Sequence, residues 1–92
     1  MEDDAIGLVS TTFSRMGRVR LDFGNCWTSG TVKAYLDGIR IASARGNTTS
    51  KTVEFNVTVG SILKITEIGA IIQFNSLEMI QCNVGEYLYQ YY

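Results

Sequence analysis

The 92-residue chain contains no histidine and no proline. Histidine is the commonest general base and metal ligand, so its absence excludes any Ser-His or Cys-His nucleophile pair within this chain. A zinc site needs four ligands, and only two cysteines, Cys26 and Cys82, are present to supply them. No metal and no cofactor is therefore expected.

The sequence also lacks a long apolar run and an excess of positive charge. No apolar stretch approaches the roughly 18 residues that a transmembrane helix requires. Eight basic residues stand against nine acidic ones, so the net charge is −1. Nucleic-acid binders neutralise phosphates and usually carry a basic excess. We therefore expect no membrane span and no nucleic-acid partner.

The carboxylates show no arrangement typical of an active site. Glycoside hydrolysis needs two of them facing each other across a cleft. Calcium needs several oxygen ligands, and the chain has no D-x-D-x-D loop. The carboxylates of the patterned region fall on turns or on the solvent faces of different predicted strands: Asp37, Glu54, Glu67 and Glu78. The sequence thus predicts a protein that is not an enzyme.

Alternation of apolar and polar residues is the main pattern that the chain does contain. "MGRVRLDFG" places Val19, Leu21 and Phe23 on one face of a strand, and "KTVEFNVTVG" and "SILKITEIG" alternate in the same way. Residues 70–82 form one long bent strand or two short ones. The apolar phase changes there, which predicts a bulge or turn near Asn75-Ser76.

Residues 31–44, "TVKAYLDGIRIASA", give the clearest local signal. Two alternating runs are joined by Asp37-Gly38, which is the preferred sequence for a two-residue type I′ turn. Asp37 is thus interpreted as a turn former, with a ligand role as the alternative. The turn sets a register that pairs Leu36 with Ile39, Tyr35 with Arg40, and Ala34 with Ile41.

Six to seven strands, spaced about ten residues apart, predict an all-β fold, a small antiparallel β-sandwich of the jelly-roll type or a small barrel. The length fits a single domain over residues 1–92. Residues 1–14 are interpreted as an N-terminal segment that can be flexible. Residues 84–92 are rich in tyrosine and form either an added edge strand or a tail. These tyrosines provide a binding surface, or they cover a sheet edge in the domain or in a dimer.

Cys26 and Cys82 form an even pair near opposite ends of the predicted core. A disulfide between them would stabilise the domain by roughly 4 kcal/mol in the chain-entropy model. In a reducing compartment they would be two buried thiols instead. Of these two alternatives, we predict a disulfide between Cys26 and Cys82.

Two N-glycosylation sequons point to an extracellular location. Asn47-Thr48-Thr49 lies in a polar loop, and Asn56-Val57-Thr58 projects from the solvent face of a predicted strand. Both asparagines, Asn47 and Asn56, are therefore expected to accept a glycan.

Three side chains are predicted to bind a ligand. Trp27, the only tryptophan, is either a core residue packed on the Cys26 bridge or a platform that stacks on a sugar. Tyr35 and Arg40 form a cross-strand pair on the solvent face of the hairpin. They are either a surface packing pair or a sugar-stacking ring with a hydrogen-bond donor beside it.

Two stretches resemble known families. "GTVKAYLDGIRIASA" resembles the Y-x-D-G hairpin of laminin-G-like and concanavalin-like jelly rolls. "SILKITEIGAIIQFNSLEMIQC" resembles the closing strands of galactose-binding-like β-sandwich modules. The resemblance implies an extracellular module that binds carbohydrate or protein and is often one piece of a larger protein. No position matches a family ligand motif closely enough to carry a role over.

The sequence therefore predicts a non-catalytic extracellular module that recognises a glycan or a protein partner. The first alternative is a structural or assembly subunit, such as an adhesin, capsid or matrix component, that forms homo-oligomers through its sheet edges. An intracellular regulatory β-domain is a further alternative, and it would have free thiols and no glycans.

Overall fold

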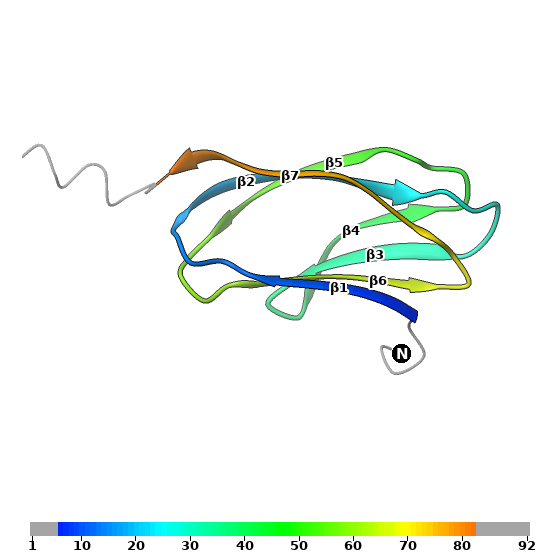
Figure 1. Ribbon diagram of the computed structural model, residues 1–92, viewed down its shortest axis with the longest axis horizontal. Coiled ribbons are helices and arrows are strands. Elements are labelled where there is room, and N and C mark those ends of the chain that lie inside the picture. The colour runs from blue at the N-terminus through cyan, green and yellow to red at the C-terminus, as the bar shows by residue number, and fades with distance from the viewer. Residues whose placement is uncertain (1–5, 83–92) are drawn as a thin grey trace, which may run out of the picture.

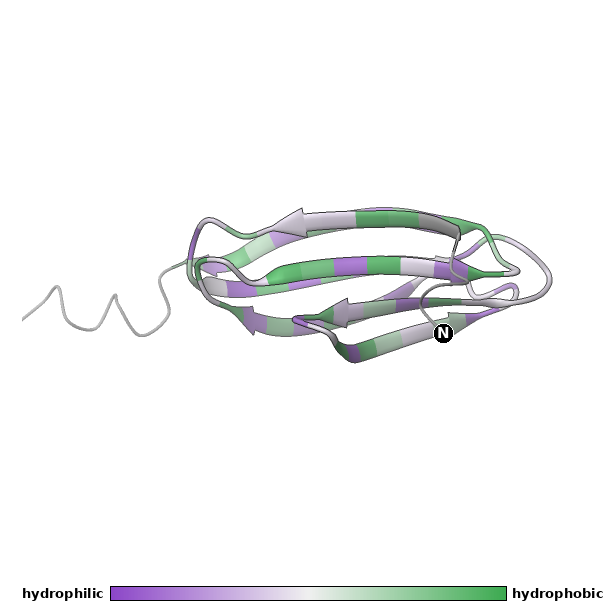
Figure 2. Ribbon diagram, turned by 90° about the horizontal axis from the view of Figure 1, so that it is seen from below, coloured by the Kyte–Doolittle hydropathy of each residue, from purple (hydrophilic) through white to green (hydrophobic). Residues whose placement is uncertain are grey.

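The computed structural model describes residues 6–82, which form seven strands and no helix (Figure 1). Short turns and loops separate the strands, and apolar and polar residues alternate along several of them (Figure 2). The strands are β1 (Ile6–Thr12), β2 (Gly17–Asn25), β3 (Thr31–Leu36), β4 (Ile39–Arg45), β5 (Lys51–Val57), β6 (Ile62–Ile68) and β7 (Ile72–Cys82).

The strands form two antiparallel sheets that pack face to face (Figure 1). The four-stranded sheet has the order β1-β6-β3-β4, and the three-stranded sheet has the order β5-β2-β7. Only β3 and β4 follow each other within one sheet, so every other connection crosses between the layers. The prediction of a small antiparallel β-sandwich is confirmed, and its jelly-roll subtype stays a prediction.

The core lies between the two sheets and is built from the inward residue of each alternating pair. Val19, Leu21 and Phe23 of β2 are completely buried, as the pattern of "MGRVRLDFG" predicts. The four-stranded sheet contributes the buried Leu63 and Ile65 of β6 to the same core. The remaining buried core residues are Val32, Ala34, Ala44, Phe55, Val57 and Ala70.

The β3–β4 hairpin has a bulge that the sequence did not predict. Tyr35 pairs with Arg40, and Leu36 with Ile39, as expected, but Ala34 pairs with Ala42 and not with Ile41. Ile41 is thus the extra residue of a bulge, which changes the phase of β4. Ala42 and Ala44 consequently face the core, whereas Ile39, opposite Leu36 beside the turn, is 70% exposed.

Strand β7 is one long strand with a bulge at the predicted position. Asp22 pairs with Ser76 and Phe23 with Phe74, so Asn75 is the unpaired residue between them. Its Nδ2 donates to Asp22 Oδ1 over 3.1 Å and to Thr49 O over 2.9 Å. The bulge therefore links β7 to the loop between β4 and β5.

The N-terminal segment forms an edge strand of the sandwich. Residues 1–14 were interpreted as a flexible segment, but β1 occupies Ile6–Thr12 and pairs with β6. Thr11 and Thr12 lie opposite Leu63 and Ile62, so this segment completes the edge of the four-stranded sheet. The tyrosine-rich segment, residues 84–92, lies outside the described residues.

Candidate functional site

A hollow of about 290 Å³ lies on the outer face of the four-stranded sheet, beside the β3–β4 turn. Strands β3 and β6 and the turn form its walls. Such a volume is close to the lower limit of small-molecule sites, so it suits one ring and not an extended ligand. The lining residues are Tyr35, Asp37, Gly38, Ile62, Lys64 and Thr66.

The turn that borders the hollow has the predicted conformation. Asp37 and Gly38 have φ angles of 51° and 83°, as a type I′ turn requires. Asp37 also connects the turn to β6: its N–H donates to Ile62 O, and its Oδ1 accepts from the Ile62 N–H, both over 2.9 Å. Asp37 is thus a turn former and, in addition, a wall of the hollow.

Tyr35 lies near the end of β3 that leads into the turn. It is directly opposite Arg40 on β4 and directly opposite Lys64 on β6. The register therefore brings Tyr35 and Arg40 together, as the sequence predicted. Arg40 is exposed and does not line the hollow, whereas Lys64 does.

Trp27 lies at the other end of β3 and belongs to a different surface. It is in the loop between β2 and β3, and it is 50% exposed. The core interpretation of Trp27 is therefore wrong. Its N–H donates to the buried Asn25 Oδ1 over 2.9 Å, and its carbonyl accepts from the Asn47 N–H over 2.7 Å. These bonds fix the loop backbone and leave the ring available as a separate platform.

The predicted disulfide is wrong. Both cysteines are exposed and unpaired. Cys82 lies opposite Gly17 at one end of β2, and the Cys26 N–H donates to Ile71 O just beyond the other end. Nine residues of strand between them span about 27 Å, whereas a disulfide needs Cα atoms within about 7 Å. The two cysteines cannot bridge within one folded chain.

The two sequon asparagines are both exposed. Asn47 has a φ of 64° in the turn that follows β4, and its side chain makes no hydrogen bond within residues 6–82. Asn56 projects outward from β5, where its Oδ1 accepts from Arg18 Nη1 over 3.0 Å. Both positions are therefore accessible, and their glycosylation stays a prediction.

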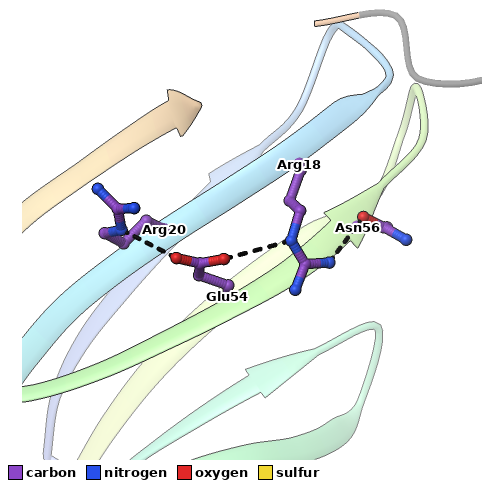
Figure 3. Close-up of polar contacts among 4 residues, drawn as sticks. All are labelled: Arg18, Arg20, Glu54 and Asn56. Atoms are coloured by element: carbon purple, nitrogen blue, oxygen red, sulfur yellow. Dashed lines mark hydrogen bonds and ion pairs between the residues drawn. The ribbon is translucent and has the colours of Figure 1, made fainter. Parts of the chain in front are cut away.

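The outer face of the three-stranded sheet carries an ion-pair network (Figure 3). Glu54 accepts from Arg20 Nε over 3.1 Å and from Arg18 Nε over 3.3 Å, and Arg20 also approaches Glu78 at 3.9 Å. The Arg20 hydrogen bond, supported by Arg18 and opposed by desolvation, lowers the pKa of Glu54. A carboxyl held ionised in this way is poorly suited to donate a proton to a leaving group.

Groupings that could bind a metal are not found in the described part of the chain. Among residues 6–82, no three cysteine or carboxylate side chains lie close enough to share a metal ion. The hollow contains one carboxylate, one ammonium, one hydroxyl and one phenol, which can hydrogen-bond a polyhydroxylated ring and stack against it. The arrangement favours binding.

Three residues of the hollow were missed by the sequence analysis, namely Ile62, Lys64 and Thr66. The outward phase of Lys64 and Thr66 was predicted, but their position beside Tyr35 depends on the pairing of β3 with β6. These strands are separated by β4 and β5 in the sequence, and no local signal specifies that they are neighbours.

No family model matches the chain, and no curated protein is similar to it. Between residues 6 and 82 there is no helix that could cross a lipid bilayer. The chemistry of the two outer faces is therefore the guide to what this protein binds.

Proposed function

We propose that the chain is a non-catalytic extracellular binding module that takes one sugar ring of a glycan into the hollow beside Tyr35. The observation that carries this proposal is the combination of an aromatic side chain with polar groups of both kinds around one small hollow. Tyr35 offers a face on which the C–H surface of a sugar stacks. Asp37 accepts hydrogen bonds from hydroxyl groups, and Lys64 donates to ring and hydroxyl oxygens.

The extracellular part of this proposal is supported by the two exposed sequons, Asn47 and Asn56. The cysteine bridge no longer supports it, because the two thiols are free. Expression in a secretory eukaryotic host, followed by peptide mapping before and after removal of N-glycans, tests the location. Glycans at both sites are expected, and their complete absence would favour the intracellular alternative.

A glycan array probed with the purified chain tests the binding function. We expect binding to a defined subset of glycans, and we expect Tyr35→Ala to abolish it because the stacking face is lost. Thr52→Ala is the matched control, since Thr52 is exposed on the opposite sheet and does not line this hollow. Binding that survives Tyr35→Ala, or an array with no signal at all, contradicts the proposal.

A second candidate function is assembly through sheet edges. Within residues 6–82, β1 and β7 each pair with a strand on one side only, and both lie on the near side of the sandwich in Figure 1. Val9 and Phe74 are opposite the buried Ile65 and Phe23, yet they are 39% and 47% exposed. Free edges with exposed apolar residues are sites of strand addition. The occupant that we assign is a second copy of this chain, paired along β7.

Light scattering at high protein concentration tests this assembly. A dimer that Phe74→Lys converts to a monomer supports pairing along β7, because the charge blocks the apolar contact between the two edges. A wild-type chain that is strictly monomeric contradicts it. A dimer that deletion of residues 84–92 dissociates, and that Phe74→Lys does not affect, identifies the C-terminal segment as the contact instead.

A further inference from the structure

The outer face of the four-stranded sheet carries basic side chains on three neighbouring strands. Lys33 on β3 and Lys64 on β6 alternate with buried core residues and therefore point away from the core. Arg40 and Arg45 on β4 lie opposite Tyr35 and Thr31, which share this outward phase. None of these four cations forms an ion pair or a side-chain hydrogen bond with another residue between 6 and 82.

On the outer face of the three-stranded sheet, by contrast, the arginines form ion pairs with carboxylates. There, Arg18 and Arg20 both bind Glu54, and Glu78 lies beside Arg20 (Figure 3). Asp22 on that face accepts hydrogen bonds from Ser50 and Asn75. The contrast indicates that, within residues 6–82, the cations of the four-stranded sheet lack the carboxylate partners that the other face provides.

Few carboxylates are available to neutralise this face. The acidic residues within the described range are Asp22, Asp37, Glu54, Glu67 and Glu78. Asp22, Glu54 and Glu78 belong to the other sheet, and Glu67 has the inward phase of Leu63 and Ile65. Within residues 6–82, Asp37 at the turn is the one carboxylate that borders the basic face. Among these described residues, the cations on β3, β4 and β6 therefore outnumber the carboxylates of the same face.

The strand register arranges three of the cations along a diagonal. Lys64 is opposite Tyr35, Lys33 is opposite Thr66 and Ser43, and Arg45 is opposite Thr31. Neighbouring strands lie about 4.8 Å apart and residues two apart on a strand about 6.7 Å apart, so each diagonal step is about 8 Å. The line Lys64–Lys33–Arg45 thus extends about 16 Å from the hollow across the sheet. That length exceeds one ring and suits a short polymer.

The polar groups in the hollow favour one class of polyanion. Asp37 would repel a phosphate or a carboxylate placed in the hollow, whereas it accepts hydrogen bonds from neutral hydroxyl groups. A polymer that presents both hydroxyls and spaced anionic groups fits the hollow and the diagonal together. Acidic polysaccharides have this chemistry, because free hydroxyl groups stand on the same rings as their sulfate or carboxylate groups, whereas DNA and peptides of Asp and Glu present anions without free hydroxyls.

We propose that the ligand is an acidic polysaccharide, with one uncharged ring edge in the Tyr35 hollow and its sulfate or carboxylate groups along Lys64, Lys33 and Arg45. This inference rests on the proposed function, and it adds the charge of the ligand and its direction across the sheet. Arg40, opposite Tyr35, provides a further cation beside the hollow.

Titration calorimetry with heparin and with chemically desulfated heparin tests the inference. The double variant Lys33→Ser with Arg45→Ser removes two charges from the diagonal and replaces none of the residues that line the hollow. We expect it to weaken heparin binding at least tenfold. The slope of log K against log salt should also fall by about one to two, because fewer counterions are released. Desulfated heparin should bind wild type weakly and should not distinguish the variant.

The matched control is Arg15→Ser with Lys51→Ser, which removes the same charge from exposed positions outside this face. The inference is overturned if the control weakens heparin binding as much as the diagonal variant, because net charge alone then explains it. Equal affinity for single-stranded DNA of matched charge also overturns it. If neutral glycans bind and depend on Tyr35 while heparin does not bind, the proposed function stands and only this inference fails.

Discussion

At the scale of single residues, one buried amide organises three loops at the end of the sandwich that carries Trp27. Asn25 is completely buried, and its Nδ2 donates to Ser29 O and Gly30 O over 3.1 and 3.3 Å. Its Oδ1 accepts from the N–H groups of Trp27 and Ile71, and its own N–H donates to Thr48 O. Buried polar groups are tolerated when they are fully bonded in this way.

Replacement of Asn25 by alanine should be strongly destabilising. The change leaves two backbone N–H groups and two carbonyls without their partner, so we expect a loss of roughly 3 kcal/mol in the free energy of unfolding. Urea unfolding followed by circular dichroism measures it. Ser76→Ala, at an exposed position of β7, is the control and should change stability by less than about 0.5 kcal/mol. Equal stability of the two variants would mean that Asn25 does not hold the loops.

Glu54 gives a prediction about pH. Its pKa is lowered in the folded state, first by Arg20, so its ionised form contributes stability above its unfolded pKa. That contribution decreases as pH falls below 4.5, the ordinary pKa of this carboxyl, and through its lower folded pKa. Glu54→Gln should therefore be less stable than wild type at pH 7 and should converge with it near pH 2. Thermal unfolding across this range measures the difference, and a difference that does not change with pH would contradict the ion pair.

At the scale of elements, the β3–β4 hairpin shows what local sequence can and cannot predict. The Asp37-Gly38 turn and the two pairs next to it follow from the sequence, because turn chemistry fixes the register over a short distance. The bulge at Ile41 does not follow, since it is set by how β4 packs on the other sheet. The hollow likewise depends on β6, which reaches β3 only through tertiary pairing.

The turn itself provides a test by substitution at Gly38. A Cβ there would meet no atom within 4 Å, so any cost arises from the φ of 83° alone. Gly38→Val should lose about 1–2 kcal/mol, because a β-branched residue resists positive φ. Gly38→Asn is the matched control and should lose clearly less, since asparagine tolerates this conformation. Chemical unfolding of both variants measures the two losses, and equal losses would indicate a steric clash instead.

The long β2–β7 ladder provides a test of the cysteine correction. Because the ladder holds Cys26 and Cys82 at opposite ends, both thiols should react with iodoacetamide in the native protein. Peptide mapping by mass spectrometry under non-reducing conditions should find two alkylated peptides and no linked pair. An intramolecular linked pair would contradict the strand pairing of β2 with β7.

At the scale of the whole molecule, the sandwich has two outer faces of different character. One face pairs its arginines with glutamates, and the other combines the Tyr35 hollow with cations that have no ion pair within residues 6–82. Strand alternation in the sequence correctly predicted the inward residues of β2 and β6, and hence the sandwich, but not those of β4 beyond its bulge. It could not predict which outward residues share a face, because five of the six connections cross between sheets.

The most direct test of the binding face is an NMR titration of the ¹⁵N-labelled chain with a short sulfated oligosaccharide. We expect the amide chemical shifts to change mainly at the outer residues of β3, β4 and β6, with the largest changes at Tyr35, Asp37 and Lys64. Amides of Arg18, Arg20 and Glu54 on the opposite sheet should not move. Shifts concentrated on β2, β5 and β7, or no shifts at millimolar oligosaccharide, would contradict it.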